Sequence, residues 1–196
     1  MAMTWIWHNV VKEIRPASFG FIDHDLIAIE KIQLGKLLDG QPFYGLPMVG
    51  KHGWSLWAGC CFYQFAVLKN LSLNFLNDFS RGLDTGGRNW NCFYKNYDHK
   101  KLQFADWQLF EAMDFFKKVP RQIEIIDHCW FHIARVGHDD SHRRHSEFYD
   151  HIAKAIEGGA NWPQLQIAIG GNIRQADKEF IEKSPWSRWR KHHFDN

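Results

Sequence analysis

One run of residues constrains the fold of this chain more than any other: positions 54–68 are almost entirely apolar, with Ser55 and Gln64 as the strongly polar exceptions. The run is short for a membrane-spanning helix, which needs roughly 20 residues. It is apolar on every side at helical spacing, which is typical of a helix at the centre of a hydrophobic core. The run therefore predicts a buried central helix over 54–69.

The composition indicates a globular chain. Of 196 residues, 45% are hydrophobic and 16% are aromatic, which excludes intrinsic disorder. The formal net charge is +2, so no global positive field exists to attract nucleic-acid phosphates or an anionic membrane. The length is that of one domain, and neither an internal repeat nor a linker divides the chain. We therefore expect a single domain over 1–196 that does not bind a membrane.

Hydrophobic periodicity and helix breakers predict a mainly α fold, a bundle of about six helices. Residues 1–53 are expected to be less regular and could contain β-structure: 4–14 and 25–38 each fit a strand or a helix, and 40–53 are rich in glycine and proline, which predicts a loop. The helical core spans 54–183, and a basic aromatic tail follows over 184–196. Besides the central helix, helices are expected over 104–118, 122–136, 139–157, from 161 onward, and over 174–183.

The cysteines and the N-terminus bear on the cellular compartment. The four cysteines, Cys60, Cys61, Cys92 and Cys129, match neither a disulfide framework nor a zinc ribbon. The N-terminal sequence becomes charged at Lys12, before an apolar stretch of signal-peptide length. We expect a cytoplasmic protein whose thiols are reduced and packed as small hydrophobic groups.

Histidine is concentrated in one segment, because six of the 12 histidines lie between positions 128 and 151, among aspartates and arginines. Imidazole and carboxylate groups bind divalent metals and transfer protons near neutral pH. This segment is therefore the candidate site, and it supports two chemical interpretations.

The first interpretation is metal-assisted hydrolysis. On the helix expected over 122–136, His128 and His132 have the i, i+4 spacing with which two imidazoles chelate one ion, and His138 and Asp139 follow at the next helix. This order of His followed by His-Asp resembles the ligand order of HD-type phosphohydrolases. The resemblance implies that these four residues bind zinc, manganese or iron. The alternative for this helix face is an ordinary polar surface in contact with solvent.

The second interpretation is metal-independent RNA cleavage, which needs no cofactor. Arg144 and His151 share a face of the helix expected over 139–157, and their spacing has the Arg-x(4–6)-His form seen in HEPN-type ribonucleases. The same form occurs at three other places in the chain. The resemblance implies that Arg144 stabilises the charge of the scissile phosphate and that His151 is the acid or base. The alternative is that both edges of the helix are polar borders in contact with water. The residues expected to assist are His142, His145 and Tyr149, and the expected buried stripe is Phe148, Ile152, Ala155 and Ile156.

The composition also suits a protein that binds a partner and catalyses no reaction. Aromatic and arginine side chains anchor protein interfaces, and ten tryptophans exceed what a core of this size commonly needs. Trp186 and Trp189 lie in the basic aromatic tail, which could bind single-stranded nucleic acid or pack its tryptophans on the body. A protein-binding inhibitor, immunity or adaptor protein is therefore expected as readily as an enzyme.

Short motifs exclude several enzyme classes. The turn at 84–89 could offer backbone N–H groups to a phosphate, or be an ordinary loop. The sequence contains no P-loop, no G-x-G-x-x-G, no serine nucleophile elbow and no H-E-x-x-H. The sequence thus predicts a phosphodiester-directed hydrolase that acts on RNA or, alternatively, a non-catalytic protein-binding module.

Overall fold

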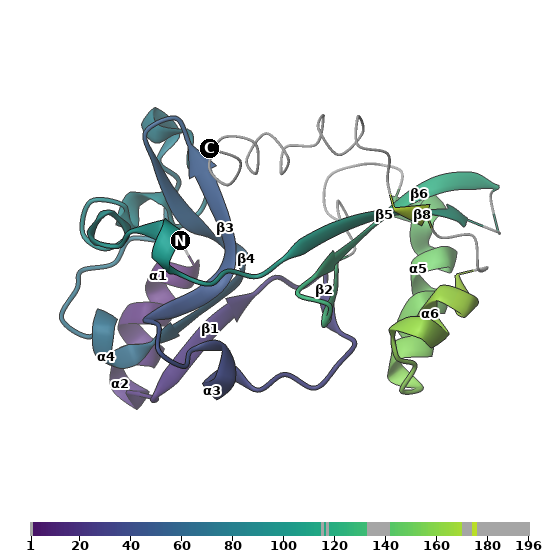
Figure 1. Cartoon of the computed structure of the whole chain (residues 1–196), viewed down its shortest axis with the longest axis horizontal. Helices are drawn as coiled ribbons and strands as arrows, with labels where there is room; N and C mark the ends of the chain where they lie inside the picture. Colours follow the sequence, from purple (N-terminus) through teal and green to yellow (C-terminus); the bar gives the residue numbers. More distant parts are fainter. Residues whose placement is uncertain (1, 115, 117, 133–141, 170–173, 176–196) are drawn as a thin grey trace. The chain divides into compact units, whose positions relative to one another are not determined.

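The computed structural model describes residues 2–114, 116, 118–132, 142–169 and 174–175. These residues form an α+β fold with two antiparallel sheets (Figure 1), so the prediction of a mainly α bundle is wrong. The described residues pack as two compact units: the first contains 2–23 and 33–105, and the second contains 24–32 and the described residues from 106 to 175. The single domain over 1–196 stays a prediction.

The first unit is built on a sheet in the order β1-β4-β3, with the long strand β4 in the middle. Its strands are β1 (Ser18–Ile22), β3 (Phe43–Gly50) and β4 (Gly53–Gln64). Its α- and π-helical segments are α1 (Ala2–Ile6), a π-helix (Trp7–Val11), α2 (Lys12–Ile14), α3 (Leu34–Leu37) and α4 (Phe65–Leu68). Four 3-10 turns follow, at Phe79–Arg81, Gly87–Asn89, Tyr94–Asn96 and His99–Lys101. Of the two structures that residues 4–14 fitted, the helix is the one that forms.

The apolar run that predicted a central helix is strand β4, followed by the single turn α4. Because β4 pairs with β1 on one side and β3 on the other, and its residues alternate between two covered faces, it is apolar on every side without being helical. A continuous apolar run does not distinguish these two structures by periodicity. The prediction of burial is confirmed, and the prediction of a helix is wrong.

The predicted loop at 40–53 is also wrong, because most of it is strand β3. Its glycine and proline have specific places in the sheet. A Cβ at Gly45 would overlap the carbonyl oxygen of Cys60 on the neighbouring strand. Pro47 lies where the pairing register shifts after Gly45, which is an irregularity that tolerates a residue without an N–H. Both residues therefore mark close approach and a bulge, although they resemble loop residues in the sequence.

The core of the first unit is a cluster of aromatic rings. Trp7 is fully buried and stacks on Phe19, with the ring centroids 5.5 Å apart. Within the core, the hydroxyls of Tyr63 and Tyr94 form a 2.7 Å hydrogen bond, which satisfies two polar groups that would otherwise be buried alone. The aromatic excess of the sequence therefore serves packing in this unit.

The second unit contains a sheet in the order β2-β7-β6-β5-β8, covered on one face by α5 and α6. The strands are β2 (Leu26–Ala28), β5 (Trp107–Asp114), β6 (Val119–Ile126), β7 (Trp130–His132) and β8 (Arg174–Gln175). The helices predicted over 104–118 and 122–136 are therefore wrong. Both segments are rich in aromatic and β-branched residues, which favour strands, and the alternation of Ile123 and Ile125 with Glu124 fits a strand of the hairpin.

Two helices are confirmed in the second unit. Helix α5 (His142–Glu157) buries Phe148 and Ile152, as the predicted stripe requires. Helix α6 (Trp162–Ala168) begins at the cap residue Asn161, whose side chain accepts a hydrogen bond from the backbone N–H of Gln164. The helix predicted over 174–183 begins instead with strand β8, and residues 176–183 lie outside the described part. Within the described residues, no helix has both the length and the apolarity to cross a membrane.

Candidate functional site

The described beginning of the histidine-rich segment, residues 128–132, lies in a β-hairpin. Asp127 and His128 occupy the turn between β6 and β7 with φ angles of 55° and 56°, and Cys129 donates a backbone hydrogen bond to Ile126 at 3.2 Å. Two consecutive residues with positive φ are the signature of a two-residue type I′ turn. His128 is exposed on this turn, whereas His132 is buried on strand β7. The helical i, i+4 argument that paired His128 with His132 therefore does not apply.

His132 instead belongs to a buried triad with Glu124 and Asp25. Glu124 is its partner across the β6–β7 pair, and His132 Nδ1 lies 2.6 Å from Glu124 Oε2. On the other edge of the ring, Nε2 lies 3.5 Å from Asp25 Oδ1. Asp25 directly precedes β2, whose Leu26 pairs with His132 across the sheet. The side chains of His132, Glu124 and Asp25 are 8%, 8% and 12% exposed.

The two carboxylates hold His132 as an imidazolium ion. Burial alone would lower the pKa of His132, but hydrogen bonds with Asp25 and Glu124 outweigh burial and raise it to about 9. Burial alone would raise the pKa of Asp25, but the hydrogen bond and charge of His132 outweigh burial and lower it. His132 is therefore protonated near neutral pH, and a histidine with this pKa is a poor general base there.

The triad does not have the arrangement of a metal site. The carboxylates of Glu124 and Asp25 lie against opposite ring nitrogens of His132. A single ion bound to one ring nitrogen could therefore not take both carboxylates as ligands. Of the other predicted metal ligands, His138 and Asp139 lie outside the described residues, and His128 lies on the hairpin turn with its Nε2 3.5 Å from Gln108 Nε2.

The triad and helix α5 lie on opposite faces of the sheet. Phe131 and Ile125 pack in one cluster with Phe148 and Ile152 of α5. His132 and Glu124 are the neighbours of Phe131 and Ile125 along their strands, and successive side chains in a strand point to opposite faces. Among the described residues, His132 and the buried stripe of α5 therefore lie on different faces of the sheet.

The residues predicted for RNA cleavage all lie in α5. His151 is exposed, and its ring centroid lies 6.3 Å from that of Phe116 in the β5–β6 connection. Arg144 lies two turns before His151, a rise of roughly 10 Å along the helix. The side chains of the remaining members are outside the described part, as is that of Arg144: His142, His145 and Tyr149.

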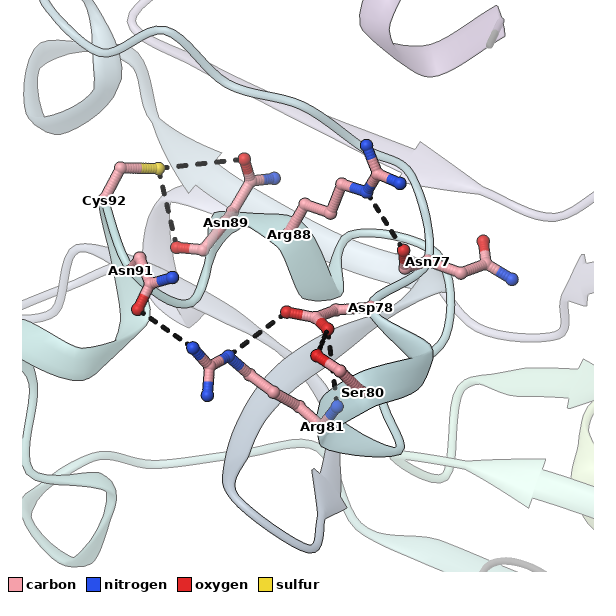
Figure 2. Close-up of polar contacts among 8 residues, drawn as sticks. All are labelled: Asn77, Asp78, Ser80, Arg81, Arg88, Asn89, Asn91 and Cys92. Atoms are coloured by element: carbon pink, nitrogen blue, oxygen red, sulfur yellow. Dashed lines mark hydrogen bonds and ion pairs between the residues drawn. The ribbon is translucent and has the colours of Figure 1, made fainter.

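A second arrangement of polar side chains lies in the first unit, around a short loop that we call the Phe79 loop, residues 78–83 (Figure 2). Asp78 and Leu83 close it with backbone hydrogen bonds of 2.9 and 3.0 Å. Asp78 accepts a hydrogen bond from Ser80 at 2.5 Å and pairs with Arg81 Nε at 3.1 Å. Between these residues, Phe79 is 83% exposed. Polar contacts therefore brace a loop that presents an aromatic ring to solvent.

Two neighbouring segments extend this network, as Figure 2 shows. Arg81 Nη2 donates to Asn91 Oδ1 at 3.3 Å, and Arg88 Nε donates to the carbonyl oxygen of Asn77 at 3.2 Å. A Cβ at Gly50 would overlap the carbonyl oxygen of Arg81, so the β3–β4 turn packs closely against the loop. The Phe79 loop and the adjoining Asn77 are thus held by contacts with three other segments of the chain, at Gly50, Arg88 and Asn91.

The turn at 84–89 does not offer its amides to a phosphate. Thr85 N donates to the side chain of Asp84 at 2.7 Å, and the following amides donate to backbone oxygens. These further donor–acceptor pairs are Gly86 to Phe75, Gly87 to Asp84, Arg88 to Leu76 and Asn89 to Gly86. The ordinary-loop alternative is therefore the one that the hydrogen bonds support.

Sequence reasoning missed the partners of His132 and the Phe79 loop. The signal for Glu124 was a charged residue between two isoleucines of a β-branched run. The signal for the loop was the order Asp78, Ser80, Gly82, in which Asp caps a turn and Gly82 adopts a φ of 69° at its end.

Comparisons with protein-family models, curated proteins and solved structures found no match for this chain. The functional argument therefore rests on the residues themselves.

Proposed function

We propose that this chain is a non-catalytic protein-binding module of the inhibitor or adaptor class, and that the Phe79 loop anchors the partner. The observation that carries the proposal is the 83% exposure of Phe79 on a braced loop. Aromatic and arginine side chains dominate the energetics of protein interfaces, and burying one phenylalanine stabilises a complex by roughly 1.5 to 3 kcal/mol.

The bracing of the loop supports this proposal. Binding costs free energy when it orders a mobile segment, and a segment already fixed avoids that cost. Asp78 engages Ser80 and Arg81, and the tight contact with Gly50 fixes the backbone at Arg81. The loop therefore presents Phe79 at a low entropic cost of association.

Site-specific crosslinking followed by affinity measurement tests the proposal. A photoreactive phenylalanine analogue at position 79 identifies the protein that it contacts in cells that express the chain. Calorimetry with that purified protein then compares the wild type with Phe79→Ala and with Ile167→Ala, a control side chain that is 76% exposed on α6. We expect Phe79→Ala to weaken binding about tenfold or more and Ile167→Ala to leave it unchanged. Equal affinity of the wild type and Phe79→Ala would contradict the proposal.

A second candidate function, RNA phosphodiester cleavage at α5, has one observation in its favour: His151 is exposed on a helix that also carries Arg144. In this proposal Arg144 stabilises phosphate charge and His151 transfers the proton, while His142, His145 or Tyr149 assists. Cleavage of RNA in EDTA tests it with His151→Ala and Arg144→Ala. Activity that is unchanged in both variants, or absent from the wild type, would exclude it.

A further inference from the structure

The cationic groups around the Phe79 loop indicate what kind of surface it binds. Arg88 is exposed, and its Nε is held by the carbonyl oxygen of Asn77 at 3.2 Å. Among the described residues, its two terminal nitrogens have no hydrogen-bond partner. Because one donor is fixed, the guanidinium is pre-oriented, with its remaining donors available for a carboxylate.

The β3–β4 turn adds a second cation beside the loop. A Cβ at Gly82 would lie 3.6 Å from the backbone nitrogen of Lys51, so the turn and the end of the Phe79 loop are in contact. Lys51 and His52 are both exposed on this turn. The loop that carries the exposed Phe79 ring therefore adjoins the two segments that carry Arg88 and Lys51.

The carboxylates of the same surface are already engaged. Asp78 is neutralised by Arg81, and one oxygen of Asp84 accepts hydrogen bonds from the backbone N–H of Thr85 at 2.7 Å and from its hydroxyl at 3.3 Å. Asp84 is exposed. The donors of Arg88 and Lys51 are thus the groups left to define the charge that a partner must complement.

We infer that the partner of the Phe79 loop is a protein surface with an apolar centre bordered by carboxylates. Phe79 fills the apolar centre, and Arg88 and Lys51 face the carboxylates. Single-stranded nucleic acid fits less well, because it needs successive stacking rings and several phosphate contacts. This inference rests on the proposed protein-binding function and specifies the partner's chemistry.

Fluorescence anisotropy with the full chain tests the inference on three probes of matched length: a labelled peptide of leucine and glutamate, one of leucine and lysine, and oligouridylate. We expect the leucine–glutamate peptide to bind, and Phe79→Ala and Arg88→Glu each to weaken that binding about tenfold or more. Added salt should weaken it as well. Lys31→Glu makes the same charge change at an exposed residue of the second unit and should have no effect.

The outcomes separate this inference from the function on which it rests. If the crosslinked partner loses affinity with Phe79→Ala but not with Arg88→Glu, the acidic partner is excluded while protein binding stands. If neither substitution changes the affinity of the crosslinked partner, both proposals fail. Tighter binding of the lysine peptide or of oligouridylate, or no binding of any probe, overturns the acidic surface.

Discussion

Replacing His132 by glutamine removes the imidazolium from the buried triad and leaves Glu124 and Asp25 on either side of an uncharged side chain. Both carboxylates are nearly excluded from solvent, with side-chain exposures of 8% and 12%. Removing one partner from a buried ionic network typically costs about 3 to 5 kcal/mol, because the remaining charge has lost its compensation. We therefore expect a large loss of stability from a substitution that changes side-chain volume little.

The pKa of His132 gives a second measure of the same effect. Its rise from 6.5 to about 9 corresponds to about 3 kcal/mol in favour of folding with the proton bound. Because the pKa is higher in the folded chain, this stabilisation is complete below about pH 6.5 and is lost as the pH rises through 9. The free energy of unfolding of the wild type should therefore fall over this range, and that of His132→Gln should not show the same fall.

Urea unfolding followed by tryptophan fluorescence measures both quantities across this pH range. The wild type should exceed His132→Gln by about 3 kcal/mol near pH 6 and approach it above pH 9. His8→Gln is the control, because His8 is exposed on the N-terminal π-helix. A folded-state pKa of His132 near 6.5 in an NMR titration would refute the reasoning, as would a free energy of unfolding that stays constant between pH 6.5 and 9.

Three further predictions follow from the structure. Burial raises the pKa of Cys61 to about 12, so its thiol should resist alkylation at neutral pH until the chain unfolds, and rapid labelling in the folded state would contradict this. Gly50→Ala should lower the melting temperature through the clash with the Arg81 carbonyl, whereas Gly35→Ala, which meets no atom within 4 Å, should not; equal melting temperatures would contradict the close contact. Both ring nitrogens of His132 face carboxylates, so dialysis against EDTA should leave the melting temperature unchanged; a fall, together with zinc, manganese or iron in the purified protein, would favour a metal site.

The sequence predicted the elements whose ends are marked locally. Helix α6 has a capping asparagine and a proline in its first turn, and α5 has a clear apolar stripe around Phe148 and Ile152. The strands could not be recognised in the same way. Both faces of β4 are covered, so apolar and polar residues do not alternate along the strand. Most residues of β5 are apolar as well, which hides its alternation.

The partners of His132 were missed for a related reason. The partner of a side chain in a sheet depends on register, and no local pattern indicates that Glu124 lies opposite His132 or that Asp25 reaches the other edge of the ring. The sequence did single out His132. The chemistry assigned to it was derived from a helix that does not form, so its partners were sought at the wrong spacing.

The path of the chain through its two units has a consequence for synthesis. Residues 24–32 belong to the second unit, but the rest of that unit begins at residue 106, after residues 33–105 of the first unit. During translation, β2 and Asp25 must therefore wait for the ribosome to supply β7 and its His132 before the edge of the second sheet can pair. A fragment that begins at residue 106 would lack this edge strand and one carboxylate of the triad. A peptide of residues 24–32 added in trans would be needed to restore them.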